Sequence, residues 1–148
     1  MFKIIQIPLE KIDLCKGLSS KRAGAFCSFE GRVRDHNNGK KVVALEYEAY
    51  GSLCEREAKK IFHEVFAKFD VIEARCYHRE GKLNVGDIAV WVGVITEHRD
   101  DGFKACRYII DEVKKRLPIW KKEYYENGQS GWVACSGCAP HSQYANLK

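Results

Sequence analysis

Hydrophobic and polar residues follow two different periods along this chain. Five segments show either strict alternation or a short apolar run between turn-forming residues, which is typical of β-strands. Two longer segments carry apolar residues three and four positions apart, which is typical of one face of an α-helix. The predicted strands cover residues 2–7, 24–34, 41–50, 71–80 and 86–98, and the predicted helices cover residues 52–69 and 100–117.

The order of these elements predicts the fold class. Asn38 and Gly39 form a pair suited to a tight turn with positive φ, so we expect a hairpin there. The segments 71–80 and 86–98 are expected to form a second strand pair, and the latter is apolar enough to be buried on both faces. Because strands outnumber helices and pair as hairpins, the sequence predicts an α+β fold with two main helices and mostly antiparallel sheet.

Polar residues near the ends of the two helices predict where each begins and ends. Ser52 is a candidate N-cap of the first helix, and Glu55 would complete a capping box. Asp100 or Asp101 is expected to cap the second helix. Pro118 lacks an N–H group and clashes with the preceding turn, so the second helix should end before it.

The composition narrows the class of protein without deciding its function. The 148 residues suit one domain spanning 1–148, and a hydrophobic fraction of 45% suits a globular core. We find neither a membrane-spanning stretch nor a signal peptide, so we expect a cytoplasmic protein. The net charge of +5 favours an anionic partner, which could be a phosphorylated metabolite, a nucleic acid or an acidic protein.

The cysteines are expected to be reduced thiols. There are seven of them, and an odd number without an export signal argues against a disulfide framework. Cys27, Cys76 and Cys106 lie within apolar patterns, where cysteine packs as a small hydrophobic residue. We therefore predict that these three belong to the core.

Lys114 has an unusual position on the second predicted helix. At about 100° per residue, the apolar stripe centres between Val113 and Ile110, and Lys114 lies within about 80° of that centre. One interpretation is that its methylene stem covers apolar surface while the ammonium reaches water. The other is a partly desolvated lysine with a pKa lowered toward neutrality, which would make it a candidate acid, base or nucleophile.

Pro118 also sets the course of the chain after the second helix. The chain must turn there, and burial of Ile119 and Trp120 would anchor the turn. Lys121 would then return toward Lys114. Such a fold-back would concentrate positive charge in one place.

Three further basic residues stand at predicted strand ends and could converge on the same place. They are Arg34, His98 and Arg99. Guanidinium groups grip phosphate or carboxylate with two hydrogen bonds, and a helix N-terminus adds oriented N–H groups. If these residues converge, the ligand should be an anion.

Four short motifs follow one another along the chain, namely F-x-G-x-V-R at 29–34, HR-x-G-x-L-x-V-G-D at 78–87, V-x-x-x-HR-x-x-x-F-x-A at 94–105 and P-I-W-K-K-E at 118–123. Together they resemble a known family, the large, catalytic subunit of molybdopterin synthase. Each motif is short, but their order and spacing extend the resemblance over roughly residues 1–134.

The resemblance implies an enzyme that converts cyclic pyranopterin monophosphate into molybdopterin by inserting the two dithiolene sulfurs. The sulfur would come from the C-terminal glycine thiocarboxylate of a small ubiquitin-like subunit, whose tail enters a pocket of the large subunit. The resemblance further implies an α/β hammerhead fold with additional antiparallel sheet. It also implies a homodimer of large subunits within a heterotetramer, and no metal or other cofactor.

The resemblance also implies which residues form the site. The two pocket lysines of the family correspond to Lys114 and Lys121, which the helix geometry and the proline also indicate. Phe29 matches an aromatic position near the pocket, although a core role suits it equally well. The positions that contact substrate correspond to Arg32, Val33, Arg34, His98, Arg99, Lys122 and Glu123.

The C-terminal tail departs from the family. An arginine expected near residue 136 is replaced by Ser136, so a basic residue reaching across the dimer stays an open question. Cys135, Cys138 and His141 have a spacing that could supply three metal ligands or a redox pair, but a structural zinc site needs a fourth ligand. We expect no metal, and a flexible or locally packed tail at 135–148.

Two other functions stay open on the residues alone. Trp120, Tyr124 and Tyr125 alternate with Lys121 and Lys122, which would suit a basic module that binds single-stranded nucleic acid, although no recognised motif accompanies them. The chain could also bind a ubiquitin-like tail without catalysis. We favour the enzyme, with neither a nucleic acid nor a membrane as partner.

Overall fold

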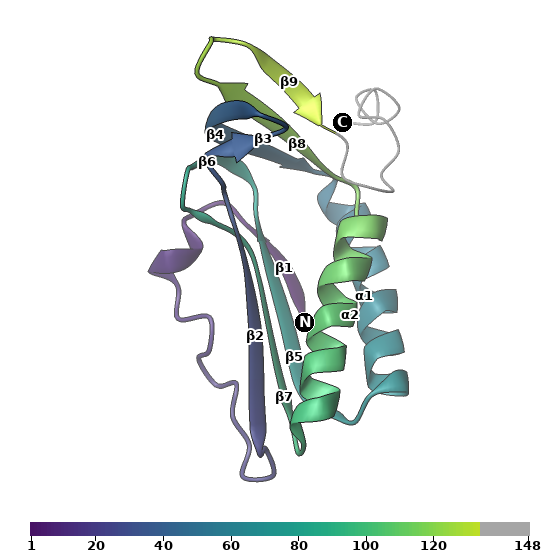
Figure 1. Cartoon of the computed structure of the whole chain (residues 1–148). Coiled ribbons are helices and arrows are strands. Elements are labelled where there is room, and N and C mark those ends of the chain that lie inside the picture. Colours follow the sequence, from purple (N-terminus) through teal and green to yellow (C-terminus); the bar gives the residue numbers. More distant parts are fainter. Residues whose placement is uncertain (134–148) are drawn as a thin grey trace.

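A computed structural model describes residues 1–133, and its strands form two sheets (Figure 1). The first sheet has the order β1-β5-β7-β2, and the second has the order β3-β4-β8-β9 with β6 paired to β4. Only β1 and β5 pair in parallel among these described strands. The α+β prediction is therefore confirmed. The elements are β1 (Phe2–Ile5), η1 (Leu9–Lys11), β2 (Ala25–Arg32), β3 (His36–Asn37), β4 (Lys40–Ala49), α1 (Gly51–Lys68), β5 (Val71–Arg79), β6 (Gly81–Asn84), β7 (Ile88–Thr96), α2 (Arg99–Arg116), β8 (Ile119–Tyr125) and β9 (Ser130–Val133).

Both helices lie against one face of the first sheet, and the N-terminal segment with η1 lies on its other face (Figure 1). Strand β7 is central, and all nine of its residues are buried, as its apolar sequence predicts. The predicted core cysteines Cys27, Cys76 and Cys106 are buried between sheet and helices. Neither helix of the described chain is long and apolar enough to cross a membrane.

Gly102 lets α2 approach the sheet closely. A Cβ atom at this position would lie 2.8 Å from Cys27 Sγ and 3.0 Å from Thr96 Oγ1, which is closer than atoms normally pack. The absence of a side chain therefore allows the observed distance between α2 and β2. That distance in turn sets where residues further along α2 lie.

The predicted caps are wrong for both helices. Helix α1 begins at Gly51 with Tyr50 as its N-cap, so Ser52 falls inside the first turn and Glu55 lies beyond it. Helix α2 begins at Arg99 after His98, so the predicted aspartate caps also fall inside the helix. The negative charges in that first turn still favour the helix dipole.

The second predicted strand pair is confirmed, because β5 pairs antiparallel with β7, whereas the first predicted hairpin differs from the structure. Asn38 and Gly39 have the expected positive φ of 47° and 75°, but the arm before the turn is the two-residue β3. Strand β2 instead pairs with β7 in the first sheet, and the predicted loop at 81–84 forms β6 in the second. Phe66 and Phe103 fit the apolar helix stripes but are 48% and 66% exposed, so the stripes are narrower than predicted.

Candidate active site

Pro118 reverses the chain between α2 and β8, as the sequence predicts. The last helical bond runs from Leu117 N–H to the Val113 carbonyl at 3.1 Å. The Pro118 carbonyl accepts a hydrogen bond from Tyr50 N–H at 3.2 Å, which ties the turn to the start of α1. Ile119 and Trp120 are buried, so the predicted anchoring of this turn is confirmed.

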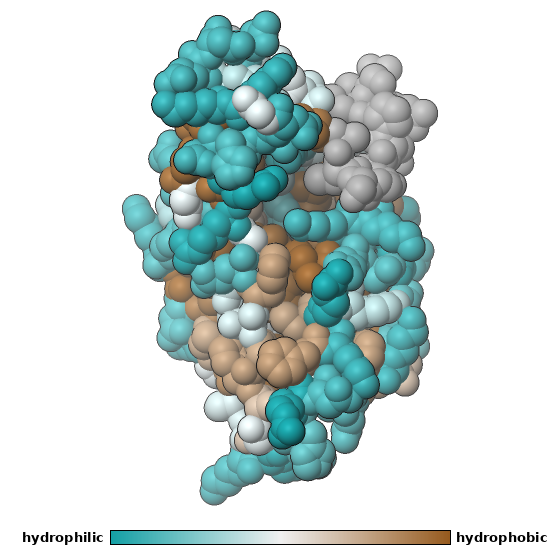
Figure 2. Space-filling model, in the orientation of Figure 1, coloured by the Kyte–Doolittle hydropathy of each residue, from teal (hydrophilic) through white to brown (hydrophobic). Residues whose placement is uncertain are grey.

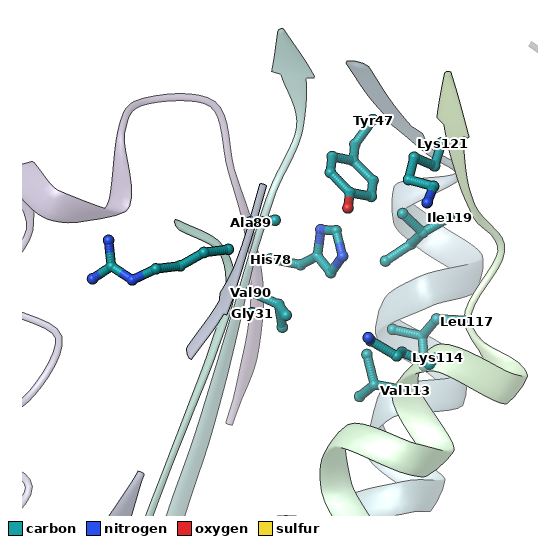
Figure 3. Close-up of a pocket in the computed structure, with 11 residues that line it drawn as sticks. Gly31, Tyr47, His78, Ala89, Val90, Val113, Lys114, Leu117, Ile119 and Lys121 are labelled. Atoms are coloured by element: carbon teal, nitrogen blue, oxygen red, sulfur yellow. The ribbon is translucent and has the colours of Figure 1, made fainter. Parts of the chain in front are cut away.

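Lys114 and Lys121 line one cleft of about 260 Å³, as predicted (Figure 3). The first sheet forms one wall, the last turn of α2 forms another, and β4 and β8 of the second sheet close the end. Lys114 projects from α2, and Lys121 lies beyond it on β8 (Figure 3). The full lining is Gly31, Arg32, Tyr47, His78, Ala89, Val90, Val113, Lys114, Leu117, Ile119 and Lys121.

Lys121 is held in place by a buried carboxylate. Its Nζ lies 2.8 Å from Glu123 Oε1, and the two side chains are 22% and 2% exposed. They are two residues apart on β8 and therefore share one face of the strand. Tyr47 is the cross-strand neighbour of Lys121 on β4, and it lines the cleft beside it.

Glu123 is the centre of a polar network beneath the cleft. Asn37 Nδ2 donates to both carboxylate oxygens at 3.0 Å, and the Tyr125 hydroxyl donates to Oε2 at 2.6 Å. Burial by itself would raise the pKa of Glu123, but the hydrogen bonds from Lys121, Tyr125 and Asn37 outweigh it and lower the pKa. Glu123 thus holds Lys121 in place, and it also lines a polar cavity that borders the cleft, so its contact with substrate stays a prediction.

Lys114 lines three different cavities. Besides the main cleft it lines a polar cavity of about 130 Å³ and an apolar groove of about 330 Å³. The residue as a whole is exposed, which favours the interpretation that its methylene stem covers apolar surface while the ammonium reaches water. Its place in the lining of all three cavities, rather than its burial, sets Lys114 apart from the other lysines of α2.

The polar cavity gathers the basic residues that come after β2. Its lining includes Arg34, His36, Lys114 and Lys121, so the predicted convergence of Arg34 on the lysines is confirmed. Arg32 lines both the main cleft and the polar cavity, but its guanidinium donates to Glu30 Oε2 and to the Gly86 carbonyl at 3.0 and 3.1 Å. The cavity is suited to an anion of about the size of a phosphate group.

The apolar groove lies between β2 and α2. It is lined by Cys27, Phe29, Phe103, Cys106 and Ile110 among others, and it reaches Lys114. In the space-filling view, apolar side chains gather on this part of the surface between the two elements (Figure 2). The groove accounts for the exposure of Phe103, which forms one of its walls.

His98 and Arg99 are not brought to the cleft. They lie at the start of α2, and Lys114 lies 15 residues further along, which corresponds to about 22 Å at about 1.5 Å per residue. Both residues are exposed. The expected convergence of these two on the lysines is therefore wrong within one copy of the chain.

Two further predicted substrate contacts face other surroundings. Val33 is buried in a cluster with Val42 and Leu45, and its backbone N–H donates to the Asp87 carbonyl at 3.0 Å. Lys122 alternates with Lys121 along β8, so it points to the opposite face of the sheet, where its ammonium lies 5.2 Å from the centre of the Tyr124 ring.

The cleft also contains two residues that the sequence interpretation did not assign to it, Tyr47 and His78. His78 Nδ1 lies 2.9 Å from the Arg79 carbonyl, and its ring packs edge-on against Tyr47 with 5.0 Å between ring centres. Burial lowers the pKa of His78 to about 4, and the charge of Lys114 acts in the same direction. His78 opens one of the four motifs, which was the available signal, whereas nothing in the sequence distinguishes Tyr47.

The aromatic residues that would stack on nucleic acid make other contacts within the fold. Trp120 is buried, and the Tyr124 and Tyr125 hydroxyls donate to the carboxylates of Glu46 and Glu123. Lys121 and Lys122 face opposite sides of the sheet. The structure therefore lacks the aligned row of lysines and rings, within residues 118–125, that this alternative requires.

Residues 1–133 contain no group of three histidine, cysteine or acidic side chains placed to hold a metal ion. The candidate ligands Cys135, Cys138 and His141 lie outside the described residues, as does Ser136.

Comparisons with known proteins agree with these features. The family model described as MoaE protein matches residues 6–116. The molybdopterin synthase catalytic subunit of Thermoplasma volcanium is 37% identical over 88% of this chain and 95% of its own length. That of Pyrococcus abyssi is 42% identical over 78% of each. The crystal structure of molybdopterin synthase from Staphylococcus aureus superposes with a TM-score of 0.82 at 35% identity, over 89% of this chain and 96% of that one.

Proposed function

Because this chain belongs to the MoaE protein family, we propose that the cleft of Lys114 and Lys121 is where it carries out the sulfur transfer of a molybdopterin synthase catalytic subunit. The observation that carries this assignment is the meeting of two lysines from separate elements in one cleft. Both lysines also line a polar cavity, and Lys114 in addition lines an apolar groove. The substrate and the sulfur donor thus have separate approaches, which meet at Lys114.

The polar cavity suits the phosphate of cyclic pyranopterin monophosphate. Arg34 and His36 line it together with both lysines, and guanidinium and ammonium groups are the usual protein partners of phosphate. The phosphate would sit there while the pterin extends into the main cleft. The carbons that receive sulfur would then lie near Lys114 and Lys121.

The two lysines have different parts in this proposal. Lys121 is fixed by its ion pair with Glu123 and provides a positive charge at a set position. Lys114 stands at the mouth of the groove and would meet the thiocarboxylate of the sulfur donor. Positive charge preorganised around a developing anion is often the largest single contribution to catalysis.

The apolar groove suits the C-terminal tail of the small ubiquitin-like subunit. An extended tail could run along β2 and α2 past Phe29 and Phe103, so that its terminal thiocarboxylate arrives at Lys114. Such a complex acts where its partner subunit and pterin substrate are made, and we expect the protein in the cytoplasm.

His98 and Arg99 require a second copy of the chain if they also contact the substrate. About 22 Å of α2 separates them from Lys114, so one phosphate cannot touch both groups within one copy. In a dimer of large subunits the start of one α2 could complete the cleft of its neighbour. We therefore assign these two residues to the partner's site in the heterotetramer.

The test is reconstitution of the reaction. The purified chain is incubated with a thiocarboxylated small subunit and cyclic pyranopterin monophosphate, and the dithiolene product is measured by mass spectrometry. Product that depends on Lys114 supports the proposal. A chain that binds the small subunit but forms no product would instead be an inactive binder of the tail.

A further inference from the structure

His78 lines the cleft, and its Nε2 atom has no part in the proposed sulfur transfer. We propose, on the basis of the proposed function, that His78 is a specificity-determining residue whose Nε2 accepts a hydrogen bond from an N–H or O–H group of the pterin.

The hydrogen bond of Nδ1 fixes the tautomer. The Arg79 carbonyl oxygen can only accept, so His78 Nδ1 must carry the proton in their 2.9 Å contact. In a neutral imidazole the other nitrogen is then an acceptor. Within residues 1–133 this ring makes no other hydrogen bond, and His78 is among the residues that line the cleft. The lone pair of Nε2 is therefore available to a ligand.

The ring is also held in one orientation and one charge state. His78 is only 8% exposed and packs edge-on against Tyr47. Burial holds its pKa at about 4, and the nearby Lys114 further disfavours a second positive charge. At neutral pH the ring thus remains an acceptor.

The surroundings make this acceptor selective. Lys114 and Lys121 donate hydrogen bonds and attract anions, but they do not distinguish one phosphorylated molecule from another. Near His78 much of the lining is apolar, with Val90, Val113 and Leu117 among its residues. A ligand without a donor at this position would leave a buried acceptor unpaired, which costs binding free energy. A pterin has N–H groups and would satisfy it.

Two substitutions separate the acceptor from the shape of the side chain. His78→Phe keeps a ring against Tyr47 and removes the acceptor, whereas His78→Gln removes the ring and keeps an acceptor oxygen. Binding of cyclic pyranopterin monophosphate to the chain without its partner subunit is measured by calorimetry. We expect His78→Phe to weaken pterin binding by about 10- to 100-fold and His78→Gln to restore most of the loss. His63→Phe, an exposed position on α1, is the matched control and should bind normally.

A second ligand distinguishes recognition from a purely structural role. Inorganic phosphate has no pterin, so its binding should be the same in His78→Phe as in the unsubstituted chain. In ¹⁵N spectra the Nε2 resonance of His78 should move on addition of the pterin and stay in place on addition of phosphate. Equal weakening of both ligands, or normal pterin binding by His78→Phe, would overturn the inference.

Reconstitution of the reaction with the partner subunit separates a failure of the proposed function from a failure of this role of His78. If the unsubstituted chain forms no dithiolene product with its partner, the proposed function fails and this role of His78 fails with it. If product forms but the Michaelis constant for the pterin is unchanged in His78→Phe, only the role of His78 is wrong.

Discussion

The two ends of helix α2 carry similar basic residues in very different surroundings. At the C-terminal end, Lys114 meets the second sheet, which closes a cleft over it and brings Lys121 and the buried Glu123 alongside. At the N-terminal end, His98 and Arg99 stand exposed, about 22 Å away. The difference shows that, within one copy of the chain, the basic residues of α2 line a cleft only where the second sheet lies against the helix.

Removing the lysine at the enclosed end should have the largest effect. Lys114→Ala is expected to lower product formation by about 1,000-fold, because the charge that faces the thiocarboxylate is lost from a preorganised site. Binding of the small subunit, measured separately by calorimetry, should be unchanged. Lys115→Ala is the matched control, since that exposed neighbour pairs loosely with Glu112 at 3.9 Å. Retention of most activity by Lys114→Ala would show that the enclosed end of α2 does not contain a catalytic lysine at position 114.

His78, which lines the cleft at the enclosed end of α2, should make the stability of the protein sensitive to acid. Its pKa is about 4 in the folded chain and about 6.5 in an unfolded one, so the unfolded state binds a proton more readily. Stability is then fully present above about pH 6.5 and is lost as the pH falls toward 4. Over this window the free energy of unfolding should fall by about 3 kcal/mol more in the unsubstituted chain than in His78→Phe. Urea unfolding at several pH values measures this, and parallel pH profiles would contradict it.

Glu123 should affect the reaction rate by holding the Lys121 ammonium in position. Glu123→Gln keeps the size of the side chain but removes the charge that holds the ammonium, and a displacement of about 1 Å in a catalytic group costs up to about 100-fold in rate. We expect turnover to fall by about 10- to 100-fold with little change in the Michaelis constant. Steady-state kinetics measure both values.

The pH dependence of stability offers a check on the same substitution. The pKa of Glu123 is lowered in the folded chain, so its contribution is present above the ordinary glutamate value and is lost as the pH falls through the lowered one. Glu123→Gln should lack this acid-dependent loss. An equal loss in both proteins would mean that the network does not stabilise the ionised carboxylate.

Much of the enclosed end was predictable from local sequence. Helical periodicity locates Lys114 relative to the core, and Pro118 forces the reversal that returns Lys121 to it. Both inferences need only residues within one turn or one bend of each other. Position along a single regular element is what sequence patterns report best.

The remaining features depend on contacts between distant parts of the chain. Asn37 and Glu123 are 86 residues apart, so no local pattern indicates that the glutamate is a buried support. The division of β2 and β4 between two sheets depends on pairing with β7 and β8. The error over His98 is of another kind, because the predicted helix over residues 100–117 already places its two ends more than about 20 Å apart at about 1.5 Å per residue.

Mixing two inactive variants would test whether the exposed end of α2 serves a neighbouring copy. His98→Ala and Lys114→Ala proteins, each of low activity, are unfolded together and refolded as an equal mixture. Random assembly makes about half of the dimers mixed, and each mixed dimer contains one cleft with both residues intact, so about a quarter of the original activity should return. Refolding each variant alone is the control. If activity does not return although mixed dimers form, His98 acts within its own copy or not at all, and the two ends of α2 do not belong to one site.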